Sequence, residues 1–422
     1  MDKYVAGLLQ FIEKSPEAFH AVSSIKEMLA EAGYEEIKET EQWNIIPGGK
    51  YFVIRNSSSI AAFHIPADTI KGFHIVAAHS DSPTFKVKEK PEIKVEEQYV
   101  KLNTEKYGGM IMGTWLDRPL SVAGRLVVRQ DGELIEVPVN VDKDLLVIPN
   151  VAIHMNRDMN KGVEYNAQTD MLPLYAAAEN DMSFMDTVAE AAGVSTEDIL
   201  AHDLFLYVRE KGRKIGAGGE YILAPRLDDL QCAYATVTAL IESVPDNYIN
   251  VSVIFDNEEV GSGTRQGADS TFLEDVLMRI TEALGRNTDW FRQKVSDSFL
   301  ISADNAHAVH PNHPEKADPT NRPYLNGGVV IKYHGSQRYT TDAFTAAVMK
   351  ELCRKANVPV QTYTNRSDIA GGSTLGNIST AHVSLPSVDI GLPQLAMHSA
   401  VETAGSKDTA YAVYMMKAFF SE

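Results

Sequence analysis

The chain has 422 residues, of which 44% are hydrophobic and 8% aromatic, and this length predicts two or three domains around sizeable cores. It carries 39 basic and 57 acidic residues, a formal net charge of −18, without a Lys/Arg-rich stretch that would follow a row of phosphates. This charge distribution argues against nucleic acid and anionic membranes as partners.

Cysteine usage and the N-terminal residues indicate a compartment. The chain has only Cys232 and Cys353, far apart in sequence, which excludes a disulfide framework and fits a reducing environment. The first residues, "MDKYVAGLLQFIEKSPEAF", lack the layout of a signal peptide, and no apolar run approaches the length of a membrane span. We therefore expect a cytoplasmic protein.

The first 88 residues predict two amphipathic helices followed by short strands. Ser15-Pro16 separates the helices, and Gly33 ends the second of them. The run "GFHIVAAHSD" is apolar enough to predict a strand buried on both faces. The predicted helices span residues 3–13 and 17–32, and the predicted strands span 50–56, 59–65 and 72–81.

From about residue 90 the pattern changes to alternating polar and apolar residues, which is typical of β-strands with one buried face. Residues 124–141 predict a hairpin, with Asp131-Gly132 in its turn. The run "DLLVIPNVAIHM", 144–155, predicts a further strand. We interpret residues 89–217 as a β-rich domain inserted into another fold.

After residue 218, predicted strands alternate with predicted helices, which indicates an α/β domain with a mixed central sheet flanked by helices. This catalytic domain would be discontinuous, comprising 1–88 and 218–422. The predicted strands are 248–260, 297–309, 327–334 and 387–393, and the predicted helices are 227–244, 271–284, 340–356 and 407–420.

Polar residues stand where the apolar runs stop. Ligands of open α/β sheets bind outside the carboxyl ends of the strands. Two imidazoles and several carboxylates match the preferences of zinc, manganese or cobalt, and a set without cysteine is more typical of a catalytic than of a structural zinc site. The residues are His79, Asp81, Asp228, Glu258, Glu259, Asp304 and His398.

Each of these residues also has a structural interpretation. His79 could be a hydrogen-bonded histidine at a strand end, Asp228 could cap the helix that follows it, and Asp304 could belong to a turn. The spacing of Asp81 from His79 favours a metal ligand, since a carboxylate there can orient the ring. Prolines interrupt any helix through the nearby histidines, which we interpret as structural: His307, His310 and His313.

The adjacent carboxylates Glu258 and Glu259 place a condition on the fold. Neighbouring residues of an extended strand point to opposite faces, so both can approach one site only if the strand ends there. Gly261 and Gly263 would help the chain to turn. A nearby metal ion would make two carboxylates at a core edge tolerable.

With these residues in place, the chain resembles the M18 family of metallo-aminopeptidases, the aspartyl aminopeptidase and aminopeptidase I group. The resemblance covers almost the whole length, and many long motifs in one order are more specific than any one of them. The motifs are "EKSPEAFHAV", "AAHSDSP", "YGGMIMGTWLDRPLSVAGRL", "IPNVAIHMNR", "APRLDDL", "FDNEEVGS", "SADNAHAVHPN", "VIKYHGSQRYTTDA" and "LPQLAMHSAVETAG".

The resemblance implies roles for these residues. Glu258 would be the general base, Asp81 would orient His79, and Asp228 would bridge two divalent metal ions per subunit, zinc or else cobalt or manganese. The implied metal ligands are His79, Asp228, Glu259, Asp304 and His398. The chain has Asp229 where many members have asparagine, which adds a negative charge beside the site.

The resemblance also implies an assembly and substrate contacts. Members form dimers through the inserted β-rich domain and assemble into tetrahedral dodecamers, in which His154 would reach a neighbouring subunit's active site. The implied substrate-binding positions are His154, Lys332, Tyr339 and Asp368. The segment "SDIAGGSTLGN" differs from the cysteine-containing version of animal members.

The predicted function is an aminopeptidase that removes the N-terminal residue of small peptides through a dinuclear metal site. Lys332 could pair with an acidic substrate side chain, which favours Asp or Glu at the N-terminus; a neutral or hydrophobic preference is the alternative. A deacylase or carboxypeptidase on a related scaffold is a further alternative, distinguished by N-acetylated peptides. A non-catalytic assembly protein is disfavoured because all five ligands are present.

Overall fold

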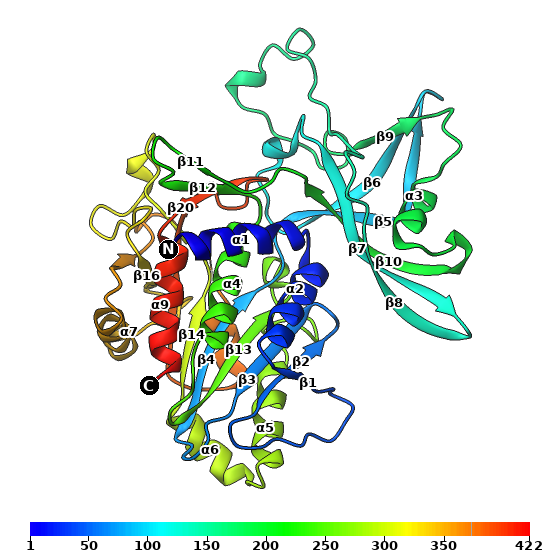
Figure 1. Cartoon of the computed structure of the whole chain (residues 1–422). Helices are drawn as coiled ribbons and strands as arrows, with labels where there is room; N and C mark the ends of the chain where they lie inside the picture. The colour runs from blue at the N-terminus through cyan, green and yellow to red at the C-terminus, as the bar shows by residue number, and fades with distance from the viewer. Residues whose placement is uncertain (373) are drawn as a thin grey trace. The chain divides into compact units, whose positions relative to one another are not determined.

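The computed structural model describes residues 1–372 and 374–422. Its chain divides into two compact units, which Figure 1 shows in the colours of the chain. The first unit comprises Met1–Asp81, Gly212–Met397 and Glu402–Glu422, and the second comprises Ser82–Lys211 and His398–Val401.

A nine-stranded sheet forms the middle of the first unit (Figure 1). Strand β4 runs parallel to β13 and β14, whereas β3 runs antiparallel to β13, so the predicted mixed sheet is confirmed. In spatial order its strands are β1 (Glu35–Glu36), β2 (Lys50–Arg55), β3 (Ser59–His64), β13 (Tyr248–Phe255), β4 (Gly72–His79), β14 (Phe299–Ala303), β18 (Ser387–Gly391), β16 (Val329–Lys332) and β17 (Val360–Tyr363).

Helices cover both faces of this sheet, because its central strands are apolar on both sides. In β4 all eight residues are buried, as predicted, and successive side chains enter different cores: Val76 and Ala78 one core, Ile75 and Ala77 the other. The first core takes α1 (Asp2–Lys14), α2 (Ala18–Glu31), α4 (Leu227–Ile241), α7 (Ala343–Lys355) and α9 (Asp408–Phe420); the second takes α5 (Phe272–Ala283), α6 (Thr288–Ser296) and α8 (Leu375–His382).

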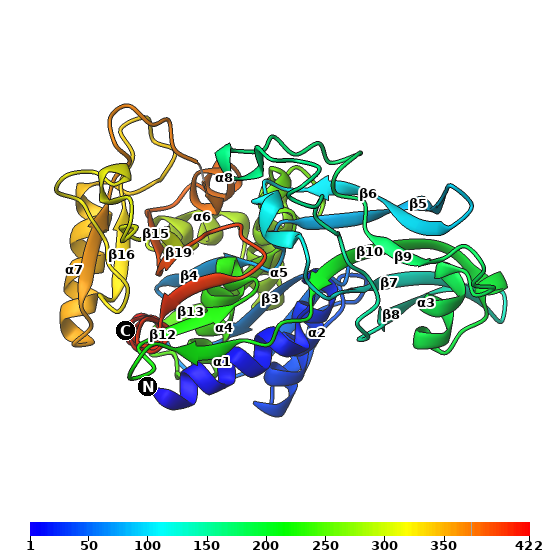
Figure 2. The same cartoon turned by 90° about the horizontal axis from the view of Figure 1, so that it is seen from above.

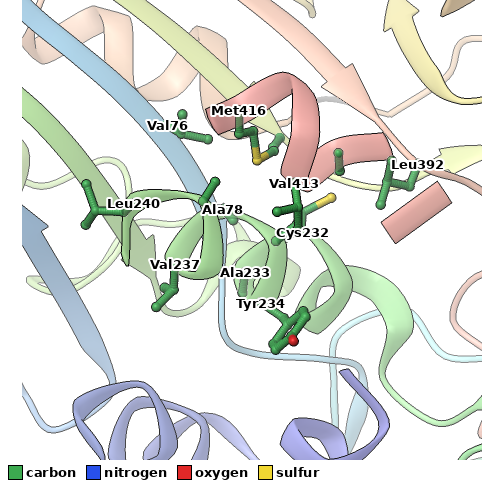
Figure 3. Packing of buried hydrophobic residues seen from close by; sticks show 14 of the residues in the cluster. Val76, Ala78, Cys232, Ala233, Tyr234, Val237, Leu240, Leu392, Val413 and Met416 are labelled. Carbon is green, nitrogen blue, oxygen red and sulfur yellow. The ribbon is translucent and has the colours of Figure 1, made fainter. Parts of the chain in front are cut away.

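Helix α4 lies at the centre of the first core (Figure 3). Cys232 and Ala233 are buried there with Val413 and Met416 of α9 and with Val76 of β4. Small side chains on α4 let the helix approach the sheet closely. The start of α4 is thereby held against the carboxyl end of the central strands.

A smaller sheet of five short strands belongs to the same unit, and Figure 2 shows β12, β15 and β19 of this sheet. In spatial order the strands are β11 (Arg213–Ile215), β12 (Tyr221–Ala224), β20 (Glu402–Gly405), β19 (Pro393–Leu395) and β15 (Ala306–His307). Strand β15 follows β14 after two residues, so this sheet brings β19 and β20 beside the end of β14.

The second unit is built on a six-stranded antiparallel sheet with one helix, α3 (Phe184–Ala192). The predicted hairpin is confirmed: β7 and β8 pair around Asp131 and Gly132, both with positive φ. In spatial order the strands are β8 (Glu133–Asn140), β7 (Leu120–Gln130), β10 (Ile199–Val208), β5 (Thr84–Val95), β6 (Tyr99–Tyr107) and β9 (Leu174–Ala177).

The strand predicted at 144–155 is wrong. Only isolated bridges form, at Leu146 and Val147. Pro149 has no N–H to extend the pairing, and Asn150 is held instead by the carboxylate of Asp117. The following residues form a turn whose apolar side chains are exposed: Val151, Ile153 and Met155.

Within the described part of the chain, every helix is too short or too polar to cross a lipid bilayer.

Candidate metal centre

The register of the central sheet brings several polar residues to one edge. In the parallel pair of β4 and β13, His79 lies opposite Phe255, so these strands stop level with one another. Strand β14 runs parallel to β4 beside it. The residues that follow these strands therefore meet at the carboxyl end, as expected for an open α/β sheet.

His79 is oriented for metal binding within the first unit. Its side chain is buried, and Nδ1 lies 3.0 Å from the main-chain oxygen of Asp81. A carbonyl only accepts, so Nδ1 donates and the neutral ring carries its lone pair on Nε2. That nitrogen lies 3.5 Å from Asp228 Oδ1 and 3.8 Å from Asp304 Oδ1.

These three residues fit a metal ion. One ligand atom each from His79, Asp228 and Asp304 lies within 4.8 Å of the others. An imidazole nitrogen with two carboxylate oxygens is a donor set that zinc, manganese and cobalt accept. The structural interpretation of Asp228 as a helix cap does not fit, since the N-cap residue of α4 is Arg226 and Asp228 has non-helical dihedral angles.

Strand β13 ends at Phe255, so the predicted strand 248–260 is too long and the expected turn lies before Glu258. Asn257 has a φ of 62°, and Glu258 and Glu259 lie in a single 3₁₀ turn. Both carboxylates can then face the same side, and they form a second group of potential ligands with His79. The strand therefore ends before Glu258 and Glu259, as it must if both carboxylates are to approach one site.

The Asp81 carboxylate holds this turn. Its Oδ1 accepts a hydrogen bond of 3.1 Å from the main-chain N–H of Glu258, and its Oδ2 accepts another of 3.1 Å from that of Glu259. Oδ1 also lies 3.3 Å from His79 Nδ1, farther than the main-chain oxygen of the same residue. Asp81 therefore contacts both His79 and the glutamate turn.

The charges of this edge shift proton affinities strongly. Burial, reinforced by the carboxylates of Asp304 and Glu259, raises the pKa of Glu258 to about 9. Burial opposes a charged imidazole at His79, but the nearby carboxylates of Asp228, Asp304 and Asp81 raise its pKa well above the usual value. Excess negative charge of this kind is what a divalent cation neutralises.

Asp229 and Lys332 lie directly behind these groups. Asp229 is fully buried, its Oδ2 accepts the main-chain N–H of His79 at 3.2 Å, and burial raises its pKa well above the usual value. Lys332 is 3% exposed; its Nζ lies 3.4 Å from Asp304 Oδ2 and 5.5 Å from the centre of the Tyr339 ring. Of the predicted substrate residues, Lys332 contacts Asp304, and Tyr339 lies next to Lys332.

The remaining predicted residues each make contacts of their own. Asp368 forms a two-bond ion pair with Arg366 on the surface. In the second unit, His154 lies in an exposed turn, and His398 Nδ1 donates to the main-chain oxygen of Gly109 at 2.9 Å. The three histidines interpreted as structural are exposed and belong to no group of potential metal ligands formed by the described residues: His307, His310 and His313.

Sequence reasoning missed three buried polar residues next to the ligands. Glu402, Gln394 and Asn305 are each at most 2% exposed and hydrogen-bond near Asp228 and Asp304. Their only sequence signal is a polar side chain inside a short apolar segment, which is also common on exposed strands.

The chain is similar to M18 proteins over its whole length. A family model described as aminopeptidase I zinc metalloprotease (M18) matches residues 11–420. Probable M18 family aminopeptidase 2 of Clostridium novyi (strain NT) is 48% identical over 429 residues, which cover 99% of this chain and 99% of that protein.

Solved structures of related proteins have a similar fold. Ape4, determined by cryo-EM in complex with Nbr1, superposes with a TM-score of 0.95 at 37% identity over 99% of this chain and 85% of that chain. The S. cerevesiae mApe1 dodecamer has a TM-score of 0.88 at 27% identity, covering 100% of this chain and 97% of that chain.

Family model, sequence relatives and fold thus agree with a sheet edge that gathers potential zinc ligands. The chain belongs to the M18 family of zinc metalloproteases and is an aminopeptidase, a hydrolase that acts on peptides as an exopeptidase.

Proposed function

We propose that this aminopeptidase works through two zinc ions per subunit. His79, Asp228 and Asp304 would hold one ion, and Glu259 and His398 would hold the other, with Asp228 shared between them. The observation that carries the proposal is the orientation of His79, whose Nδ1 faces the Asp81 main-chain oxygen while Nε2 faces the carboxylates of Asp228 and Asp304. Cobalt or manganese would suit the same donors.

Glu258 is the proposed general base. Bound divalent metal ions activate water and polarise the scissile carbonyl in sites of this kind. Glu258 takes a proton from the attacking water and passes it to the amine that leaves. Burial among carboxylates raises the proton affinity of Glu258, and bound cations at the adjacent ligands would lower it again, so that the side chain could both accept and release the proton.

Replacing Glu258 tests this role. We expect Glu258→Gln to keep its zinc and to lose about 100-fold or more in kcat, since general base catalysis typically contributes that much. Glu197→Gln, on the exposed surface, is the matched control. A chelator should abolish activity of both the native enzyme and the control. Full activity of Glu258→Gln would overturn the base assignment.

We further propose a preference for acidic N-terminal residues, through Lys332 and, near it, Tyr339. Lys332 is a buried ammonium beside a proposed metal ligand. Asp368 and His154 remain proposed substrate contacts from the family resemblance. Peptides that differ only in an N-terminal Asp, Glu or Leu measure the preference, and Lys332→Met should reduce kcat/KM for Asp and Glu more than for Leu.

A preference for neutral residues is the second candidate. It is favoured by one observation: the Lys332 ammonium is already paired with Asp304 at 3.4 Å. A higher kcat/KM for the Leu peptide, with Lys332→Met affecting all three peptides equally, would establish this candidate and exclude the acidic preference.

We also propose that residues 1–88 and 218–422 form the catalytic domain and that residues 89–217 mediate dimerisation within a tetrahedral dodecamer. Two observations support this assembly: the related mApe1 forms a dodecamer, and exposed apolar residues flank His154 in the second unit. A cytoplasmic location is proposed as well, and cell fractionation tests it.

A further inference from the structure

We infer that Glu402, Gln394 and Asn305 are positioning residues that fix Asp228 relative to Asp304. This inference rests on the proposed function, in which both aspartates are zinc ligands. Glu402 and Asn305 contact the main chain at Asp228, and Gln394 joins their side chains.

Glu402 holds the main chain at Asp228. It lies on β20 with 2% of its surface exposed, and its Oε2 accepts a hydrogen bond of 3.0 Å from the main-chain N–H of Asp228. Asp228 and Asp229 have non-helical dihedral angles, so this N–H belongs to a kink near the start of α4. A charged acceptor makes such a bond stronger than a neutral one.

Asn305 connects the other ligand to the same segment. It follows Asp304 directly, and its Nδ2 lies 3.0 Å from the main-chain oxygen of Leu227, the residue before Asp228. The same amide nitrogen lies 2.8 Å from Gln394 Oε1 and 3.2 Å from Gln231 Oε1. The end of β14 is thereby tied to the start of α4 by a side chain that is 2% exposed.

Gln394 closes the network. Its Oε1 accepts from Asn305, and its Nε2 faces Glu402 Oε1 at 3.5 Å. Strands β19 and β20 are paired antiparallel, which sets Gln394 and Glu402 in a defined register. Glu402 and Asn305 therefore both hold the main chain that carries Asp228, Asn305 does so from the residue after Asp304, and the two meet through the amide of Gln394.

Glu402 places a carboxylate in the core, where an apolar side chain would be more usual. Burying such a group costs stability unless it is hydrogen-bonded, and an apolar side chain of similar size would pack without that cost. A fully matched polar network, however, specifies one geometry. A carboxylate at position 402 therefore fits a role in positioning Asp228 rather than a role in stabilising the fold.

Glu402→Gln tests the network with a nearly isosteric change. The amide offers one acceptor oxygen; if this oxygen keeps the Asp228 N–H, the new NH₂ group faces the NH₂ group of Gln394. We expect zinc to bind about 10- to 100-fold more weakly, the usual cost of disturbing groups that orient metal ligands. Competition with a chromophoric chelator measures this affinity, and kcat should fall at unchanged KM.

Adding Gln394→Glu to the same chain should rescue the defect. The new carboxylate at position 394 can accept from both the amide at position 402 and Asn305, so every donor again has an acceptor, and the total charge equals that of the native chain. Zinc affinity and kcat should return to within a few-fold of the native values. If Glu402→Gln alone does not fold, the double variant decides: native zinc affinity supports the network, and lost affinity overturns it.

Two further variants separate this inference from the function on which it rests. Asp408→Asn is the matched control, because Asp408 is also a buried carboxylate that accepts main-chain N–H groups, those of Asn326 and Gly328; it should leave zinc affinity unchanged. Asp228→Asn should lose zinc. Native zinc affinity in Glu402→Gln together with loss in Asp228→Asn overturns the positioning role alone, whereas native affinity in Asp228→Asn overturns the proposed ligand set.

Discussion

At the scale of single residues, Asp81 shows how one side chain serves two functional groups. Both carboxylate oxygens accept main-chain N–H groups of the turn that carries Glu258 and Glu259. His79, by contrast, has its shorter contact with the main-chain oxygen of Asp81. Replacing the carboxylate should therefore disturb the glutamate turn more than the histidine.

We predict that Asp81→Asn lowers kcat by about 10- to 100-fold while much of the zinc is retained. An asparagine offers one acceptor oxygen, so one of the two N–H groups of the turn loses its partner, but the His79 contact to the main chain persists. Steady-state kinetics with metal analysis measures both quantities, and the exposed Asp68→Asn serves as control. Loss of zinc in parallel with kcat would show that Asp81 acts mainly through His79.

The residues that could bind a metal were the part of the candidate site that the sequence predicted best. The positions of His79, Glu259 and Asp304 after apolar runs indicate metal ligands, and the pairing of β4, β13 and β14 brings these runs to one edge. Glu402 could not be recognised in this way. Its partner is a main-chain N–H distant in sequence, and a main-chain contact leaves no mark on residue type.

Among the elements, the central strands of the first unit and most of its helices were predicted individually, whereas in the second unit only the hairpin of β7 and β8 was. Helix α6 was missed because Phe291 is the one fully buried residue among its nine. Strand β17 was missed because it lies at the sheet edge and buries only Tyr363 fully. The wrong strand at 144–155 has the apolar composition of a strand but no partner along most of its length.

His74 gives a prediction at this scale, because it joins β4 to the end of α9. Its buried ring stacks on Tyr248 at 3.8 Å and on Phe419 at 4.2 Å between ring centres. Burial lowers the pKa of His74 to about 3. The folded state thus binds this proton less readily than the unfolded state, so the associated stability is complete above about pH 6.5 and is lost as the pH falls toward 3.

We predict that His74→Phe weakens the acid dependence of stability. The free energy of unfolding of the native enzyme should fall, relative to the variant, by about 2 kcal/mol between pH 7.5 and pH 5. Urea unfolding at the two pH values measures the difference, and metal release affects both proteins alike. His310→Gln, at an exposed histidine, should keep the native dependence; equal pH dependence in His74→Phe would contradict the buried neutral ring.

At the scale of the whole molecule, the exposed residues of the chain determine how its subunits assemble. The turn around His154 exposes Ile153 at 47% and Met155 at 83% of their surfaces. Exposed apolar side chains that gather in one patch mark interaction sites, and three of them lie within this turn, at Val151, Ile153 and Met155. They agree with the proposed dimerisation through the β-rich insert.

We predict that Met155→Asp shifts the enzyme from the proposed assembly of twelve 46.5 kDa subunits toward smaller species. A charge in an apolar contact is unfavourable because it loses its hydration on association. Light scattering after size exclusion measures the mass. Met182→Asp, which changes another exposed methionine of the same unit, is the comparison. An unchanged mass for Met155→Asp would place the assembly contact elsewhere.

The proposed dinuclear zinc site lies at the carboxyl end of the central sheet. Anomalous diffraction at the zinc edge, from crystals of the zinc-loaded enzyme, tests it most directly. We expect two peaks per subunit, one within bonding distance of His79 Nε2, Asp228 and Asp304, and a second that shares Asp228 and contacts Glu259. A single peak, or peaks that leave Asp228 unbound, would contradict it.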